Sequence, residues 1–360
     1  MYATCKPRRI LRVALLVSIL STLVCVPVRA ADVALRSPWD AVPVTANESA
    51  FSCPDETPPL PRDFATNSYL IDPQHSIPDD ILKQEHDTSV SGIESFSRFV
   101  VRAADAYRTT GSRAAAECVV NLLQGAAEQG ALAGNMDGHQ AVYTQGSNLG
   151  AWAIAFLKVR GSGVATPEQN RQISAWLKKL ARGNEAYYNM RRLRRGPNDG
   201  YSHHLYWAGF AVAAAAVANN DQGMFRWAMG AYKQGVSDIR EDGTLPIEMD
   251  RGQLALHSHI YALAGLVMLA EFGDVNGMDL YAEKNSAIGR LIAVCVSGIE
   301  DPSFFQRETG VAQVVEPEVQ PWEISWARPY TRRFPNPKLD SLLGKAVRLN
   351  YTMLGGLPPA

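Results

Sequence analysis

Apolar residues recur every three or four positions along most of the chain, from about residue 92 onward. This period is typical of helices that bury one face. No stretch alternates apolar and polar residues long enough to predict a strand. The expected helical segments are residues 93–109, 113–129, 144–160, 167–182, 203–218, 222–238, 251–272 and 284–298.

Turn and capping residues divide these segments. Gly111, Gly130 and Gly161 follow three of the runs, as glycines at helix C-termini do. Residues 166–169 open the fourth segment with a threonine cap, a proline and a capping-box glutamine. Helices of about 15 residues joined by short loops favour antiparallel pairs. We therefore expect an all-α fold, an incomplete α/α toroid of helix pairs with a cleft at one end.

The predicted organisation has four parts. Residues 1–30 are expected to be a signal peptide. Residues 31–91, which are rich in Pro, Asp, Ser and Thr and lack a sustained period, predict an irregular N-terminal arm or lid. Residues 92–335 are expected to form the toroid, and residues 336–360 a tail that packs on the toroid or extends from it.

The first 30 residues have the composition of a signal peptide. Lys6, Arg8 and Arg9 precede an apolar run that reaches Val26, and Ala30 supplies the small residue of a cleavage site. The run is short for a membrane span of ~20 residues, and we expect no membrane span in the mature chain. These features predict a periplasmic or secreted protein.

Removal of this leader changes the charge and the cysteine count. The chain has 35 Lys and Arg against 36 Asp and Glu, and five of the cations lie in the leader, which leaves a formal charge of −6. Such a surface does not favour nucleic-acid binding, and a polyanionic ligand would need a local basic patch. Three cysteines remain. Cys295 lies in an apolar run, so a disulfide between Cys53 and Cys118 would tie the arm to the body.

Two short segments hold four of the seven histidines together with aromatic residues. On a helix, His203 and His204 lie four and three residues before Trp207 and therefore on neighbouring parts of one face. His257 and Tyr261 are likewise four residues apart. A run of arginines precedes the first segment and either forms a solvated loop or guides a polyanion. These are Arg191, Arg192, Arg194 and Arg195.

Three interpretations of these segments remain open. A metal site is disfavoured, because adjacent histidines on a helix diverge by about 100° and the usual His-x₃-His spacing is absent; we expect neither a metal nor a cofactor. Helix packing alone is the second interpretation. The third is acid–base chemistry on a sugar polymer, in which aromatic rings stack on sugars while His and Tyr transfer protons. The metal site would use His203, His204, His257 and His259.

Other enzyme classes find less support in the sequence. It contains no serine-hydrolase elbow, phosphate loop or dinucleotide fingerprint. A glycosidase with paired carboxylates could draw on Glu241, Asp242 and Glu248, but their spacing singles out none of them.

Several short motifs occur in an order and spacing that match one known family. They are Ser52-Cys53-Pro54, Glu117-Cys118, His204-x-Tyr206-Trp207, Gly243-x-Leu245-Pro246, Ala255-Leu256, His259-x-Tyr261-Ala262-Leu263, Val275-Asn276-Gly277 and Trp326-x-x-Pro329-Tyr330. In these motifs the sequence resembles the periplasmic alginate (poly-mannuronate) lyases of the α/α-toroid type, over about residues 51–335. The resemblance also implies the Cys53–Cys118 disulfide.

Such lyases cleave a uronate polymer by β-elimination. The C5 carboxylate is neutralised, a base removes the C5 proton, and an acid protonates the departing O4. By resemblance, Tyr261 is the acid and also the base, and His204 neutralises the carboxylate or assists as base. Trp207 is expected to stack on the sugar or shape its subsite, and Tyr206 is a further expected substrate contact.

Three positions depart from the family pattern. His203 stands where the family has asparagine, and Leu254 stands where it has arginine, seven residues before the tyrosine. Ser68, just before Tyr69, stands where the lid has lysine; Tyr69 itself is an expected substrate contact. Losing one arginine–carboxylate contact removes a charge-assisted hydrogen bond, which contributes roughly 1.5–3 kcal/mol of free energy.

Other side chains could replace these lost groups. A protonated His203 or His257 can donate to a carboxylate. Arg251 lies ten residues before Tyr261, ~15 Å away along a straight helix, so it would help only if the helix start bends inward. We therefore expect a lyase for a different uronate-containing exopolysaccharide, such as one with glucuronate or a branched, less charged repeat.

Two alternatives to this lyase remain open. One is a catalytically impaired, lyase-like protein that binds polysaccharide and assists export together with other exopolysaccharide-export proteins. The other is a glycoside hydrolase on a related toroid.

Overall fold

Helices make up most of the chain in the computed structural model, which describes residues 34–194 and 198–359. The predicted signal peptide and Arg195 lie outside the described residues. The long helices are α1 (Asp80–Thr110), α2 (Arg113–Gln129), α3 (His139–Val159), α4 (Pro167–Arg192), α5 (His203–Asn219), α6 (Gln222–Asp238), α8 (Ala255–Asp274) and α9 (Glu283–Glu300). The short helices are α7 (Pro246–Met249), α10 (Ser303–Thr309), α11 (Pro321–Ile324), α12 (Ala327–Arg333) and α13 (Pro337–Lys345). Two-residue strands β1 (Phe64–Ala65) and β2 (Met136–Asp137) pair in parallel.

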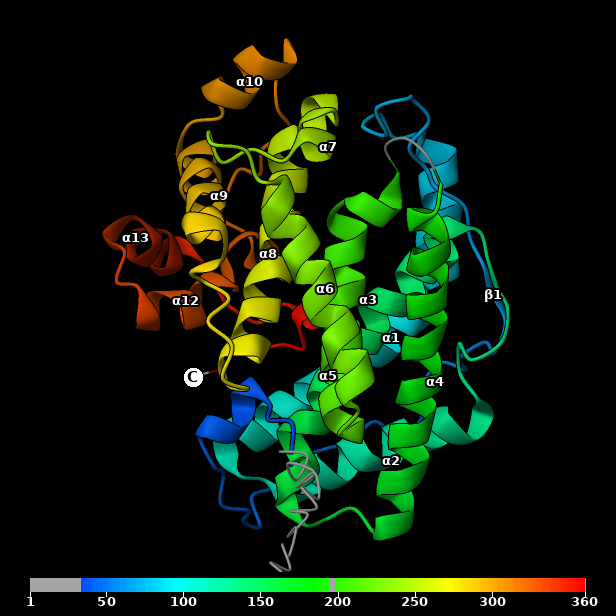
Figure 1. The fold of residues 1–360 in the computed structure, drawn as a ribbon. Helices are drawn as coiled ribbons and strands as arrows, with labels where there is room; N and C mark the ends of the chain where they lie inside the picture. Colours follow the sequence, from blue (N-terminus) through cyan, green and yellow to red (C-terminus); the bar gives the residue numbers. More distant parts are fainter. Residues whose placement is uncertain (1–33, 195–197, 360) are drawn as a thin grey trace, which may run out of the picture. The chain divides into compact units, whose positions relative to one another are not determined.

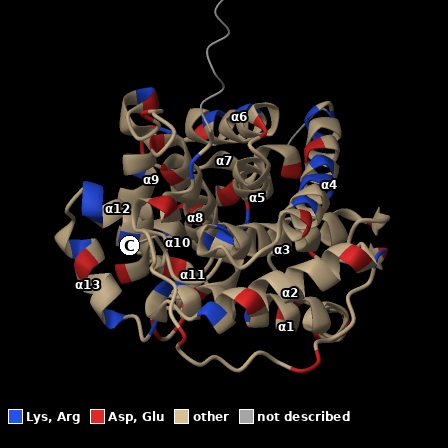
Figure 2. Cartoon of the chain, turned by 90° about the horizontal axis from the view of Figure 1, so that it is seen from below, with Lys and Arg blue, Asp and Glu red and all other residues tan. Residues whose placement is uncertain are grey.

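The long helices form two layers (Figure 1). In the inner layer α3 packs between α1 and α5, and α5 packs against α8; helices α2, α4, α6 and α9 cover these from outside. Helices α5 and α8 are apolar around almost their whole circumference, because they are buried on every side. Charged residues lie instead on outer helices such as α4, while α5 carries none (Figure 2). This arrangement confirms the predicted incomplete α/α toroid of helix pairs.

Local sequence signals set several of the helix ends. Gly111 and Gly130 adopt left-handed conformations with φ of 75° and 62° and end α1 and α2 as predicted. Thr166 and Gln169 form the predicted capping box of α4. The prediction for Gly161 was wrong. A 3₁₀ turn over Arg160–Ser162 extends the end of α3, so the left-handed residue is Gly163.

Three helices are longer than the apolar period predicted. Helix α1 begins at Asp80, capped by Asp79, and its first turns are exposed and show no apolar stripe. Helix α3 begins five residues before the predicted start at 144, with the polar pair His139 and Gln140. Helix α4 continues to Arg192, so Arg191 and Arg192 lie on its last turn rather than in a loop. A helix needs an apolar stripe only where it packs on the core, which explains the missed turns.

Within the described residues, one helical segment passes the length and composition test for a membrane span, although none is expected after the leader. It runs from Gly252 to Asp274 and has a mean hydropathy of 1.4. In the structure 78% of its most apolar window is buried within the protein. Its apolar character is therefore that of a core helix.

The two ends of the described chain are tied to the helices. The Cys53–Cys118 disulfide joins the arm to α2, as predicted, and Cys295 is a free thiol buried in α9. The disulfide holds the arm against α2, and residues 68–78 of the arm line the cavity described below.

The C-terminal tail returns to the inner helices. Lys158, buried on α3, donates to the Gly355 carbonyl at 2.6 Å and pairs with Asp105 of α1 at 2.5 Å. Gly356 has a φ of 90°, and a side-chain carbon there would lie 2.3 Å from an Asp105 carboxylate oxygen. Only glycine permits this approach. This contact positions Tyr351, five residues earlier in the chain, near the N-terminal ends of the inner helices.

Candidate active site

A cavity of about 600 Å³ lies at the N-terminal ends of the inner helices. Its walls come from the first turns of α1, α3, α5 and α8, together with arm residues 68–78 and the tail. Helix N-termini carry partial positive charge and favour bound anions. Five of the seven histidines line this cavity, which therefore gathers most of the histidines of the chain. They are His75, His86, His203, His204 and His257.

Tyr261 reaches this cavity from the first half of α8. Its ring lies parallel to the Trp207 ring at 4.5 Å and to the His257 ring at 6.0 Å, and Trp207 Nε1 donates to the Tyr261 carbonyl at 2.8 Å. Burial raises the pKa of the Tyr261 hydroxyl well above its usual value, and hydrogen bonding with Tyr143 and Tyr351 adds to the shift. Tyr261 is therefore a rigidly held, neutral phenol that can donate a proton.

His203 is paired with a carboxylate that the sequence analysis did not single out. Glu248 of α7, 1% exposed, accepts from His203 Nδ1 at 2.8 Å and from the His203 backbone N–H at 2.7 Å. Arg251 Nε lies 3.8 Å from the same carboxylate. Burial would raise the pKa of Glu248, but the positive charges of His203 and Arg251 and these hydrogen bonds lower it to about 2. The ionised Glu248 orients His203 and leaves its Nε2 for a ligand.

His204 lies beside His203 in a different environment. The two rings stack at 4.2 Å, and the edge of His204 meets Tyr143 at 4.6 Å and His139 at 5.4 Å. Its Nδ1 is 3.1 Å from the Ser202 hydroxyl. Burial lowers the pKa of His204 well below its usual value, and the positive charge of His203 adds to this. His204 is therefore neutral at pH 7 and can accept a proton.

Sequence reasoning missed four residues of this cluster. Glu248 is separated from His203 by 45 residues and lies in a one-turn helix, and its only local signal is the neighbouring Gly243-x-Leu245-Pro246 motif. Tyr143, His139 and Tyr351 lie on other inner-layer elements and in the tail, and carry no spacing signal. They meet only because four helix ends and the tail converge.

Two expected substrate contacts lie behind the cavity wall. Trp207 and Tyr206 are each 1% exposed and do not line the cavity. Trp207 packs on Tyr261 from inside the protein, so it supports the tyrosine rather than offering a surface to a sugar. The Tyr206 hydroxyl points away and donates to the Tyr201 carbonyl at 3.4 Å. By contrast, Tyr69 and His257 do line the cavity.

Arg251 lines the cavity because the chain bends before α8. A straight helix would have placed it ~15 Å from Tyr261. Instead α8 begins only at Ala255, and a 3₁₀ turn over Gly252–Leu254 precedes it. This bend brings Arg251 to the wall beside Leu254, where the family pattern has arginine.

The three described arginines of the run do not reach the cavity. Arg191 pairs with Asp199, and Arg192 donates to Gln234 at 3.0 Å. Arg194 is exposed on the surface. None of these three lines the cavity, so a role in guiding a polyanion would act only at a distance.

The charges that line the cavity are balanced. Lys83 and Arg251 are the cations, and Glu94 and Glu316 the anions. Lys83 Nζ lies 5.7 Å above the ring of Tyr69, next to the position where the family pattern has lysine. Among the described residues, no group of three or more His, Cys, Asp and Glu is arranged to hold a metal ion.

The buried histidines make the stability of the fold depend on pH. Burial lowers the pKa of His139, His204, His257 and His259, and for His257 burial and the charge of His203 lower it to about 4. The unfolded chain binds these protons near pH ~6.5 and the folded chain does not. Stability is therefore lost as the pH falls below this value, by up to about 1.4 kcal/mol per histidine and pH unit.

We expect the midpoint of thermal unfolding, followed by circular dichroism, to fall between pH 7 and pH 5. The His257→Gln variant should show a shallower fall. In the matched control, His75→Asn, the fall should be as steep as in the parent protein. An unfolding midpoint that does not change over this range would contradict the buried, neutral state of these histidines.

Known proteins of related sequence act on polysaccharides. The family model described as alginate lyase matches residues 46–305. A polysaccharide lyase of Stenotrophomonas maltophilia is 37% identical over 81% of this chain and 85% of its own length. An alginate lyase of Pseudomonas syringae pv. syringae is 34% identical over 66% of this chain and 63% of its own length.

Solved structures of similar fold come from the same group of proteins. A His-to-Ala variant of alginate lyase A1-III, complexed with tetrasaccharide, superimposes with a TM-score of 0.75 and 23% identity over 86% of each chain. Alginate lyase A1-III from Sphingomonas species A1 gives a TM-score of 0.71 at 22% identity over 87% of each chain. At this identity the likeness supports the fold alone.

Proposed function

Because this chain belongs to the alginate lyase family and is a polysaccharide lyase, we propose that it cleaves an acidic exopolysaccharide by β-elimination at a uronate. Tyr261 and His204 transfer the protons in this proposal, and His203, held by Glu248, neutralises the uronate carboxylate. The observation that carries the proposal is the Tyr261 phenol, which lines one cavity together with these two histidines.

Neutralising the C5 carboxylate is the first requirement of the reaction. His203 and Arg251 line the cavity and bind this carboxylate in the proposal, and the partial positive charges of the four inner helix N-termini act in the same direction. Negative charge moves onto this carboxylate as the C5 proton leaves, so donors fixed in advance stabilise the transition state. His203 takes the place of the family's asparagine, and Arg251 that of the arginine replaced by Leu254.

Proton transfer divides between His204 and Tyr261. The lowered pKa of His204 leaves a neutral imidazole that can remove the C5 proton, and the raised pKa of Tyr261 keeps a phenol that can protonate O4. The C5–H and C4–O4 bonds break and a C4–C5 double bond forms. Tyr143 touches both residues and would carry the proton back between them. The resemblance assigned both transfers to Tyr261, whereas the neutral state of this phenol favours a separate base.

The lid side of the cavity supplies a further cation. Ser68 replaces the family's lysine, and Lys83 of α1 lies over the neighbouring Tyr69 ring. We assign to Lys83 the contact with the acidic polymer that the lid lysine makes in the family. In this proposal the cation lies on a helix instead of the arm, where it also pairs with Asp87 at 2.5 Å.

A panel of polymers tests the proposal. Polymannuronate, polyguluronate, polyglucuronate and a glucuronate-containing heteropolysaccharide are each incubated with the protein, and the ultraviolet absorbance of the C4–C5 double bond is followed. We expect this absorbance to rise with at least one polymer. New reducing ends without it would favour a hydrolase, and tight binding without turnover on every polymer would favour the non-catalytic alternative.

The proposal includes an exported protein. The leader composition and the Cys53–Cys118 disulfide support a periplasmic or secreted location, since disulfides persist in oxidising compartments. An exported lyase would meet the exopolysaccharide during or after its secretion, beside any export proteins. Fractionation of cells that express the full chain would test this location.

A further inference from the structure

We infer that a second cavity, adjoining the first, is a subsite for a neutral sugar, so that the preferred polymer carries a neutral sugar next to the uronate at which it is cleaved. This inference rests on the proposed lyase function and narrows its substrate class. It is carried by the wall that the two cavities share and by the side chains of the second one.

The second cavity has a volume of about 450 Å³ and shares three lining residues with the first. These are His257, Val314 and Glu316. His257 lies one turn before Tyr261 on α8, about 6 Å along the helix axis. A polymer whose reacting sugar lies at Tyr261 therefore reaches the second cavity with a neighbouring or branching sugar.

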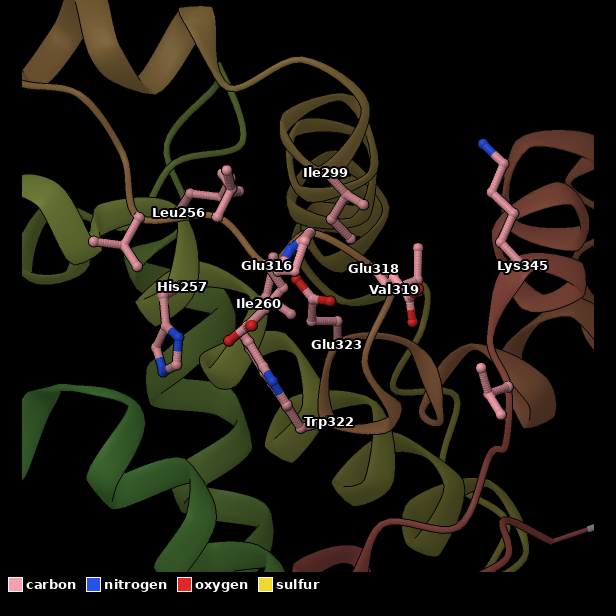
Figure 3. Close-up of a pocket in the computed structure, with 14 residues that line it drawn as sticks. Leu256, His257, Ile260, Ile299, Glu316, Glu318, Val319, Trp322, Glu323 and Lys345 are labelled. Carbon is pink, nitrogen blue, oxygen red and sulfur yellow. The ribbon is translucent and has the colours of Figure 1, made fainter.

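An aromatic wall suits this cavity to a pyranose ring. Trp322 of α11 lies against His257, with ring centroids 4.4 Å apart (Figure 3). Leu256, Ile260 and Ile299 add apolar surface around the pair. An indole that is half-buried offers a flat apolar face, which can cover the C–H face of a sugar.

The polar side chains favour hydroxyl groups over carboxylates. Glu316, Glu318 and Glu323 line the cavity and Lys345 is its one lining cation, on the side of α13. In the described part of the chain neither Glu316 nor Glu318 takes part in a salt bridge, and Glu323 accepts from the Gln320 backbone N–H. Ionised carboxylates accept strong hydrogen bonds from sugar hydroxyls.

The same carboxylates repel an acidic sugar. Like charges that meet in a binding interface suppress the wrong partner. The first cavity differs, because Lys83 and Arg251 balance its two carboxylates. The first cavity is therefore suited to the uronate and the second to an uncharged sugar. A homopolymer of uronates cannot supply the uncharged sugar.

Kinetics on two polymers test the inference. One is polyglucuronate, and the other is gellan, in which single glucuronates are separated by neutral sugars. The protein should have the higher kcat/KM on gellan. Trp322→Ala should lower this value about tenfold on gellan, as expected for loss of an aromatic anchor, and by a clearly smaller factor on polyglucuronate.

A second variant reverses the charge of an exposed carboxylate of the second cavity. Glu318→Lys should raise kcat/KM on polyglucuronate and lower it on gellan. The matched control is Glu308→Lys, which makes the same charge change on exposed α10 and lines neither cavity. Equal kinetics of Trp322→Ala, Glu318→Lys and the parent protein on both polymers would overturn the inference while leaving the lyase proposal intact.

Binding of a neutral oligosaccharide separates the two proposals. Cellotriose is titrated calorimetrically into the parent protein and into Trp322→Ala. Binding to the parent protein that is lost in the variant supports the neutral-sugar subsite, even if no polymer is cleaved. Absence of cleavage on every polymer would defeat only the lyase proposal. Absence of cellotriose binding to the parent protein, together with a preference for polyglucuronate, would defeat the subsite.

Discussion

The Tyr261→Phe variant is expected to lose about 1,000-fold in kcat on the best polymer, with little change in the unfolding midpoint. The loss follows from removal of the proton donor for O4, within the range of about 10²–10⁴ typical of general acid catalysis. Stacking on Trp207 is kept, because phenylalanine retains the ring. The rate of double-bond formation, followed by ultraviolet absorbance, measures the effect.

A matched control distinguishes chemistry from packing. Tyr232→Phe removes another buried hydroxyl, which donates to the Leu280 carbonyl at 2.6 Å and lies outside the cavity. This variant should lose stability, about 1 kcal/mol for one hydrogen bond, but keep its kcat. If Tyr261→Phe retained more than a tenth of the parent rate, O4 would have to receive its proton from another group.

The Glu248→Gln variant is expected to lower kcat/KM about 100-fold, the scale of losing one fixed electrostatic group in an active site. The carboxylate holds His203 through hydrogen bonds to its backbone N–H and ring Nδ1, and the amide that replaces it carries no charge. The His203 ring would then lack its charged partner when the uronate binds. Steady-state kinetics from pH 5 to pH 9 measure the loss.

Two comparison variants sharpen this prediction. Asp242→Asn removes a carboxylate from the loop before α7, which does not line the cavity, and should leave kcat/KM unchanged. His203→Asn restores the residue of the family pattern, and in this background Glu248→Gln should cost much less than 100-fold. An equal loss from Glu248→Gln in the parent protein and in the His203→Asn background would show that Glu248 acts without His203.

The candidate site was only partly predictable from the sequence. Helical spacing of three or four residues puts the site side chains on the inner faces of α5 and α8, where they lie together. They are His203, His204, His257 and Tyr261. Spacing also misled. Trp207 lies on the same helix as His204, yet its ring is turned inward against Tyr261. Spacing defines a face, but the packing partners decide which side chains on it reach the cavity.

By itself the sequence determined the helix pairs, most of their ends, the disulfide and the two histidine segments. Each of these depends on contacts within a few residues or on the pairing of the few cysteines, so the pattern along the chain carries the information. Only the tertiary structure decided the partner of His203, the inward bend that brings Arg251 to the wall and the convergence of Tyr143 and Tyr351 on Tyr261. It also decided that a second, acidic cavity adjoins the first. These features join segments far apart in the chain, and their geometry exists only once the four inner helices and the tail have packed.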